Sequence, residues 1–224
     1  VIKEISKNNL DVNKETNYEF AKKAFGYVTK YDAAISNHLG KLNLDNSKNK
    51  MPDTLTLHYQ KSYDLRYGEN PHQDGSFFVQ DNISEACVAN SVQLQGKELS
   101  LNNIYDADSC FETVKEFNSN ACVIVKHNNP CGVAESLDLI SSYRMAYSSD
   151  PSSAFGGIVS FNRPVNGDLA KLLLEKQFLE VLLGPSFSEE ALAVLATKEN
   201  VRVLELPTLA PDRKLFDYKK VVGG

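Results

Sequence analysis

Two side chains suited to acid–base chemistry follow the most apolar segment of the sequence. Residues 121–125 are all apolar, and Lys126 and His127 come directly after them. At the end of a buried strand, a lysine can stabilise an oxyanion and a histidine can transfer a proton near neutral pH. Pro130 and Gly132 are predicted to hold a tight turn after them. The structural alternative is a solvated loop lysine and a turn histidine.

Two further polar segments could bind an anionic or planar ligand. Residues 65–73 have the sequence LRYGENPHQ, in which glycine and proline exclude a regular helix. Arg66 could hold a phosphate or carboxylate and Tyr67 could stack on a planar ring; the alternative is a surface turn with a partly buried tyrosine. Residues 152–157 resemble an anion-binding glycine loop but match neither phosphate-binding fingerprint.

The cysteines predict neither a zinc site nor a disulfide framework. They form no Cys-x-x-Cys pair and share no recurrent spacing with the histidines; the four are Cys87, Cys110, Cys122 and Cys131. A zinc-deaminase signature fails too, because Asn129 follows His127 where a glutamate is required and Ala134 replaces the second cysteine. We expect reduced thiols in the cytosol.

Strand and helix patterns alternate around these motifs. Mostly apolar strands separated by helices predict an α/β fold, with a mainly parallel sheet covered by helices on both faces. In such sheets ligands bind beyond the carboxyl ends of the strands, here the loops after Val125, Phe161 and Leu183. The predicted strands are residues 76–79, 92–94, 121–125, 157–161, 178–183 and 201–206. The predicted helices are residues 103–117, 137–147, 168–176 and 188–196, the first with Ala107, Cys110, Phe111 and Val114 inward.

The N-terminal part has a different pattern. Residues 14–39 carry apolar side chains at steps of three and four, with Asn13 as N-cap and Gly40 at the end, which predicts an isolated amphipathic helix. Residues 41–53 are polar and have the composition of a linker. Residues 54–224 are long enough to form a domain, whereas the first 40 residues are too few to form a core of their own.

Composition excludes several functional classes. The 224 residues are 42% hydrophobic and 24% charged, as in soluble globular proteins, and no apolar run approaches the roughly 18 residues of a membrane span. The net charge of -5 argues against a sequence-independent nucleic-acid binder. Because the chain starts at Val1 and stops after Gly223 and Gly224, we expect a piece of a longer protein.

Three motifs in this order resemble a known family. They are LRYGENPHQ at 65–73, VKHNNPCGVA at 125–134 and DPSSAFGGIVSFNR at 150–163. Together they resemble the transformylase half of the bifunctional PurH/ATIC family, in which aminoimidazole carboxamide ribonucleotide (AICAR) formyltransferase is joined to IMP cyclohydrolase. Residues 96–103 and 180–192 also resemble the sequence of this family, and the helix at 14–39 resembles the last helix of its cyclohydrolase domain.

The resemblance implies a reaction and roles for individual residues. In the family, a formyl group passes from 10-formyltetrahydrofolate to the 5-amino group of AICAR, giving FAICAR, in de novo purine biosynthesis. Lys126 and His127 match the lysine–histidine pair at the reacting centre, with His127 as candidate base and Lys126 as candidate oxyanion stabiliser. The residues that match AICAR-contacting positions are Arg66, Tyr67, Asn103, Gly156 and Glu180, the last of which is aspartate in some relatives.

The resemblance also implies a cytidine-deaminase-like lobe and a cytoplasmic homodimer that needs no metal for catalysis. Residues 1–40 would form the C-terminal end of the cyclohydrolase domain, and residues 54–224 would form the first lobe of the transformylase domain. Residues 41–53 would be the linker between the two. Most of the folate site would lie in a second lobe outside this chain, so we expect little activity from the chain alone. The competing hypotheses are a catalytically inert nucleotide-binding fragment and a structural protein; Lys126 and His127 favour the enzyme, because a pure binder needs no base beside a cation.

Overall fold

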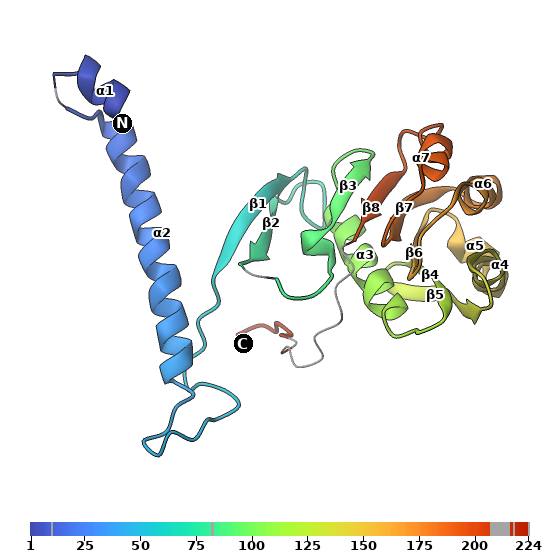
Figure 1. The fold of residues 1–224 in the computed structure, drawn as a ribbon, viewed down its shortest axis with the longest axis horizontal. Helices are drawn as coiled ribbons and strands as arrows, with labels where there is room; N and C mark the ends of the chain where they lie inside the picture. Colours follow the sequence, from blue (N-terminus) through green and yellow to red (C-terminus); the bar gives the residue numbers. More distant parts are fainter. Residues whose placement is uncertain (10, 82, 207–215, 217, 224) are drawn as a thin grey trace. The chain divides into compact units, whose positions relative to one another are not determined.

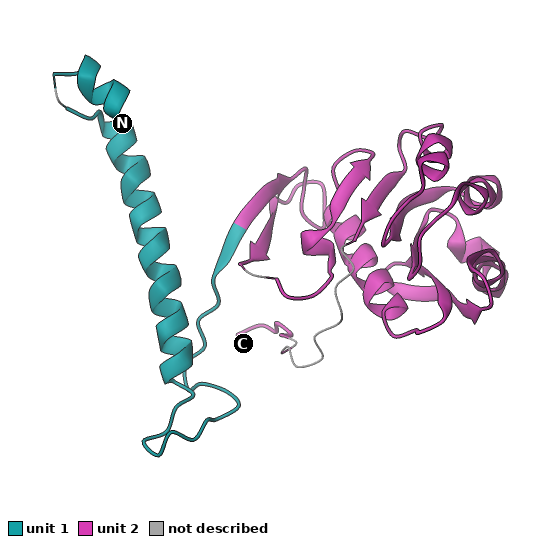
Figure 2. Ribbon diagram, viewed as in Figure 1, with its two compact units in different colours: residues 1–60 teal, residues 61–224 magenta. Residues whose placement is uncertain are grey.

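The computed structural model describes residues 1–9, 11–81, 83–206, 216 and 218–223. They form two compact units, Val1–Gln60 and Lys61–Gly224, which are coloured separately in Figure 2. The division falls within strand β1 (Tyr59–Leu65). The domain and linker boundaries drawn from the sequence stay a prediction.

The first unit is dominated by one long helix. Helix α1 (Ile2–Lys7) is short, whereas α2 (Lys14–Leu39) has the predicted bounds. The predicted N-cap is confirmed, because the Asn13 side chain accepts a hydrogen bond from the Thr16 N–H at 2.8 Å. The apolar face of α2 is not covered within this unit: Phe25 and Tyr27 are each 75% exposed.

The described residues form two sheets. Strands β1 and β2 (Gly75–Gln80) pair with each other, and six further strands form a mixed sheet in the order β3-β8-β7-β6-β4-β5. Strands β6, β7 and β8 are parallel, and the other neighbouring pairs of this sheet are antiparallel. The strands are β3 (Val92–Gln95), β4 (Asn120–Lys126), β5 (Asn129–Ser136), β6 (Gly157–Phe161), β7 (Leu179–Gly184) and β8 (Arg202–Glu205).

Helices cover both faces of the six-stranded sheet, so the predicted α/β class is confirmed (Figure 1). Side chains on one face pack against α3, and those on the other pack against α4, α6 and α7. The helices are η1 (Val88–Asn90), α3 (Leu101–Val114), α4 (Leu139–Ser149), α5 (Pro151–Ala154), α6 (Gly167–Lys176) and α7 (Glu189–Leu195). The four side chains predicted to point inward from α3 are all buried.

The apolar run at residues 121–125 is explained by burial on both faces of the sheet. Val123 and Val125 belong to the cluster around α3, whereas Cys122 and Ile124 belong to the cluster around α4 and α6. All are fully buried. A strand with two buried faces loses the alternation of a half-exposed strand, as the sequence indicated.

The turn predicted at Pro130 and Gly132 is wrong, because both residues lie in strand β5. The chain reverses earlier, at His127 and Asn128, whose φ angles are 52° and 61°. A two-residue hairpin loop with two positive φ values matches the right-handed twist of its strands. Pro130 is tolerated because β5 is an edge strand, where a missing N–H removes no necessary ladder bond.

Candidate functional site

Six of the seven predicted site residues line one pocket of about 560 Å³. They are Tyr67, Asn103, Lys126, His127, Gly156 and Glu180. The exception is Arg66, which is exposed beside Tyr67 but does not line the pocket. Residues from separate chain segments, none adjacent in sequence except Lys126 and His127, therefore meet at one place.

The pocket lies at the end of the sheet where β4 finishes and β6 and β7 start. Because β4 is antiparallel to β6, its carboxyl end meets the amino ends of the parallel strands. The loop after Val125 therefore lines the pocket as expected, but the loops after Phe161 and Leu183 do not. For those two loops the expectation was wrong, since it assumed that β4 runs parallel to β6 and β7 in a mainly parallel sheet, whereas β4 is antiparallel to β6.

The turn that carries His127 is tied to helix α3. The Asn128 N–H donates to Asp106 Oδ1 at 2.7 Å, and Ser109 Oγ donates to Asn128 Oδ1. Asn129 Nδ2 donates to the His127 carbonyl oxygen at 2.9 Å. These bonds leave the His127 side chain exposed at the rim of the pocket.

Lys126 is half-buried and directed to the segment before β6. Its ammonium group donates to the carbonyl oxygen of Phe155. The next residue, Gly156, has a φ of 69°, and its N–H donates to the Phe178 carbonyl oxygen at 2.8 Å. A Cβ at Gly156 would lie 3.8 Å from Lys126 Nζ, an ordinary contact distance, so it is the left-handed backbone that calls for glycine here.

Glu180 and Asn103, which both line the pocket, are in contact with each other. Asn103 Nδ2 donates to Glu180 Oε2 at 3.4 Å, while Asn103 Oδ1 accepts from the Ser100 N–H in the capping box of α3. Asn103 thus has a structural role besides its predicted contact with the ligand. Arg202 NH1 also approaches Glu180 Oε2, at 3.3 Å.

Tyr67 comes from the segment that was predicted to be non-helical. Residues 66–73 form bends and turns after β1, held by a bond from the Gly68 N–H to the Gln73 carbonyl oxygen at 2.6 Å. The Asn70 N–H donates to Gln73 Oε1 at 2.8 Å. Tyr67 is half-buried, as the structural alternative expected, and also lines the pocket.

Sequence reasoning did not single out Asp106, which lines this pocket, or Arg202, which contacts Glu180 from outside the lining. Asp106 lies three positions after Asn103 on α3, a spacing that places both on one face of the helix. Arg202 is a charged residue in a predicted strand that is otherwise mostly apolar. The spacing of Asp106 and the charge of Arg202 are both visible in the sequence, but neither shows which residue the side chain contacts.

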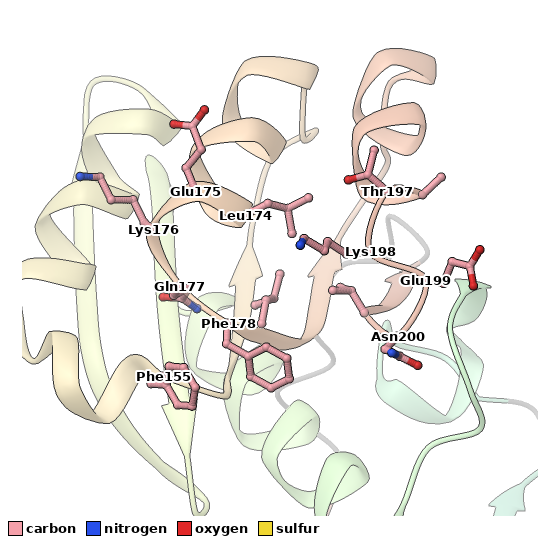
Figure 3. Close-up of a pocket in the computed structure, with 13 residues that line it drawn as sticks. Phe155, Leu174, Glu175, Lys176, Gln177, Phe178, Thr197, Lys198, Glu199 and Asn200 are labelled. Atoms are coloured by element: carbon pink, nitrogen blue, oxygen red, sulfur yellow. The ribbon is translucent and has the colours of Figure 1, made fainter.

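A larger pocket of about 870 Å³ lies between the C-terminal ends of α6 and α7 (Figure 3). Phe155 and Phe178 line both pockets, and their ring centroids are 5.5 Å apart. In Figure 3, Lys198 extends toward Leu174 across this space. The larger pocket contains none of the predicted site residues, and its two lysines and two glutamates leave no net charge.

The remaining groups that could support other chemistry are the thiols. All four cysteines are free, and burial raises the pKa of Cys110 and Cys122 well above the usual value. Within the part of the chain that the structure describes, no cluster of three or more His, Cys, Asp or Glu side chains could hold a metal ion. No helix there is long and apolar enough to cross a membrane.

Comparisons with known proteins identify the family. Among solved structures, RibD of Acinetobacter baumannii (form 2) is similar at 13% identity and a TM-score of 0.37, over 44% of this chain and 35% of that chain. This likeness is too distant to bear on the fold or the site, and the chain spans about a third of that protein. A family model described as AICARFT/IMPCHase bienzyme matches residues 1–224. The chain therefore belongs to the AICARFT/IMPCHase bienzyme family of purine biosynthesis.

Proposed function

We propose that the pocket binds AICAR and that Lys126 and His127 serve the transfer of a formyl group from 10-formyltetrahydrofolate to its 5-amino group. The observation that carries this proposal is the meeting of six residues, assigned to substrate or chemistry by family resemblance, in one pocket. Membership in the AICARFT/IMPCHase family supports the same reaction.

His127 is proposed as the general base. The 5-amino group of AICAR is a weak nucleophile, because its lone pair is delocalised into the imidazole and carboxamide. As its nitrogen attacks the formyl carbon, His127 removes a proton from it. The bond from that carbon to the folate nitrogen then breaks, and the proton is delivered to this departing nitrogen. The side chain of His127 is exposed and lines the pocket, which supports this role.

Lys126 is proposed to stabilise the oxyanion of the tetrahedral intermediate. Its ammonium group is held by the Phe155 carbonyl oxygen, so part of its orientation is fixed before the ligand binds. The remaining donor positions of the ammonium group are available to the developing negative charge. Lys126 could also assist proton delivery to the folate nitrogen.

The other pocket residues are proposed to hold the nucleotide. Tyr67 would contact the ring or ribose, and Arg66 would reach the anionic part of the ligand from outside the pocket. Glu180 would accept hydrogen bonds from ribose hydroxyls, with Asn103 beside it. Gly156 would allow the ligand to approach the backbone.

We further propose that this chain contributes only part of a complete formyltransferase site. The resemblance assigns most folate contacts to a second lobe and closure of FAICAR to IMP to the cyclohydrolase domain. It also implies a cytosolic homodimer. The chain alone should therefore bind AICAR but show little turnover with 10-formyltetrahydrofolate, and robust turnover would contradict this part of the proposal.

Titration calorimetry with AICAR tests the nucleotide site. Wild type should bind, and Arg66→Ala should bind about 10- to 100-fold more weakly, as expected for loss of a charged hydrogen-bonding partner. Arg144→Ala is the matched control, since Arg144 is an exposed arginine on α4 that does not line the pocket. Unchanged affinity of Arg66→Ala would remove Arg66 from the site, and absence of binding by wild type would refute the nucleotide assignment.

The catalytic role requires the full-length bienzyme. His127→Ala should leave AICAR affinity near that of wild type and lower kcat by roughly 10²- to 10⁴-fold, the range for a general base. His38→Ala, an exposed histidine on α2, is the control. A loss far below this range would exclude His127 as the base and favour a pocket that only binds the nucleotide.

A further inference from the structure

Glu180 is the extra residue of a β-bulge. Gly157 on β6 is opposite Leu179, and the next residue, Ile158, is opposite Val181, so Glu180 has no partner in this ladder. The bulge places Leu179 and Val181 in different core clusters, on opposite faces of the sheet, although in a regular strand they would share a face. Glu180 thereby lines the pocket at 38% side-chain exposure.

The two donors to this carboxylate converge on the same oxygen. Asn103 Nδ2 lies 3.4 Å from Glu180 Oε2, and Arg202 NH1 lies 3.3 Å from the same atom. Among the described residues no hydrogen bond is made to Oε1. One carboxylate oxygen is therefore held by the protein, while the other is free to accept a hydrogen bond from a ligand.

Arg202 is itself held by contacts other than the one to Glu180. Its Nε donates to the Glu98 carbonyl oxygen at 3.3 Å, and its side chain is only 17% exposed. Gly96, with a φ of 93°, lies so close that a Cβ there would be 2.8 Å from Arg202 Cα and 2.9 Å from its Cγ. The segment before α3 thus packs against Arg202, whose side chain does not line the pocket.

We propose that Arg202 is a positioning residue that holds the Glu180 carboxylate with Oε1 toward the pocket and so sets the preference for a ligand with ribose hydroxyls. The proposal rests on the proposed nucleotide binding in this pocket. A planar guanidinium fixed by a backbone carbonyl and a glycine contact can hold a carboxylate in one orientation, which a flexible ammonium group does less well.

The test compares AICAR with its 2′,3′-dideoxy analogue, which lacks both hydroxyls. In calorimetry, wild type should bind AICAR about 10- to 100-fold more tightly than the analogue, as expected for hydrogen bonds to a charged acceptor. Arg202→Met should reduce this ratio toward one while leaving affinity for the analogue unchanged. Arg202→Lys, which keeps the charge, should restore part of the ratio.

A double-mutant cycle shows whether Arg202 acts through Glu180. In a Glu180→Ala background, Arg202→Met should cause no further loss of AICAR affinity. If Arg202→Met lowered AICAR affinity equally in the wild-type and Glu180→Ala backgrounds, the proposal would be overturned in favour of a direct contact between Arg202 and the ligand. If Arg202→Met lowered affinity equally for AICAR and the analogue, the proposal would be overturned in favour of a general structural role. Circular dichroism and the Tm of Arg202→Met report whether the variant folds.

A ligand-free structure separates this proposal from the proposed function. In crystals of Arg202→Met the Glu180 side chain should leave the position it has in the wild-type chain, whereas an unchanged carboxylate would overturn the positioning role whatever the ligand. Wild type could fail to bind AICAR while the Arg202→Met crystals still show a displaced Glu180 side chain. That result would refute AICAR as the ligand of the pocket but would leave the positioning of Glu180 by Arg202 standing. If Arg202→Met does not fold, Arg202→Gln is a polar but uncharged variant that can take its place in these experiments.

Discussion

The carboxylate of Asp106 accepts a hydrogen bond from the backbone N–H of Asn128 at 2.7 Å, which joins helix α3 to the turn between β4 and β5. His127 and Asn128 both have positive φ angles in this turn. For most residues with a side chain this conformation costs about 1–2 kcal/mol, although asparagine and histidine adopt it more often than most. The bond to Asp106 offsets part of that cost, and the position of the proposed base therefore depends on a residue of α3.

Replacing Asp106 by alanine should loosen this turn. Without the carboxylate, the Asn128 N–H is exposed to water, and its amide hydrogen should exchange about 10- to 100-fold faster, as expected for loss of a charge-assisted bond. Hydrogen exchange followed by NMR gives the rate at this residue. Asp106→Asn keeps an acceptor oxygen and should show a smaller effect; equal exchange rates in wild type and Asp106→Ala would contradict the anchoring role.

Replacing Gly132 by alanine should destabilise the second unit. A Cβ at Gly132 would lie 2.1 Å from the Ala146 carbonyl oxygen, so β5 and α4 could not keep their present separation. The expected loss in the free energy of unfolding is at least about 2 kcal/mol, measured by urea denaturation.

Gly26→Ala is the control for the Gly132 variant. A Cβ at Gly26 would meet nothing within 4 Å, and Gly26 lies inside helix α2. Alanine there should raise helix stability by about 0.5–1 kcal/mol. A urea midpoint for Gly132→Ala equal to that of wild type would show that α4 and β5 separate at little cost.

Stability should depend on pH through Asp150, the N-cap of α5. Hydrogen bonds from the Ser153 side chain and backbone lower the pKa of Asp150 below its usual value of 3.8. Because the folded-state pKa is the lower one, the stabilisation is present above pH 3.8 and is lost as the pH falls through the folded-state pKa.

The Asp150→Asn variant isolates this titration. Asparagine caps a helix about as well as aspartate but does not ionise. Between pH 5 and about pH 2, the free energy of unfolding of wild type should fall more steeply than that of the variant. Parallel curves for the two proteins would show that Asp150 does not contribute to acid sensitivity.

The four thiols should divide into two reactivity classes. Cys110 and Cys122 are fully buried, and desolvation raises the pKa of both. Cys87 and Cys131 are partly exposed. A disulfide reagent such as DTNB at pH 8 should therefore modify two thiols of the native chain and all four in denaturant. Cys131→Ser should remove one of the two early reactions, and rapid reaction of all four native thiols would contradict the described core.

Local pattern in the sequence was enough to predict most elements. The apolar spacing in 14–39 and the cap at Asn13 predicted α2 with its observed bounds, because helix periodicity and capping depend on residues a few positions apart. Strands β4 and β6 were predicted for the same reason, β4 from the wholly apolar run 121–125 and β6 from the mostly apolar run 157–161. The resemblance to a known family also selected six residues that lie together in one pocket.

Tertiary structure decided what depends on distant partners. Strand β5 was missed because Pro130 resembled part of a turn, and only pairing with β4 makes it an edge strand. The direction of β4 determines which end of the sheet holds the pocket, and pairing is not encoded in the pattern of one strand. The contact between Arg202 and Glu180 depends on a bulge between β6 and β7, a feature of register that no local spacing in the sequence can specify.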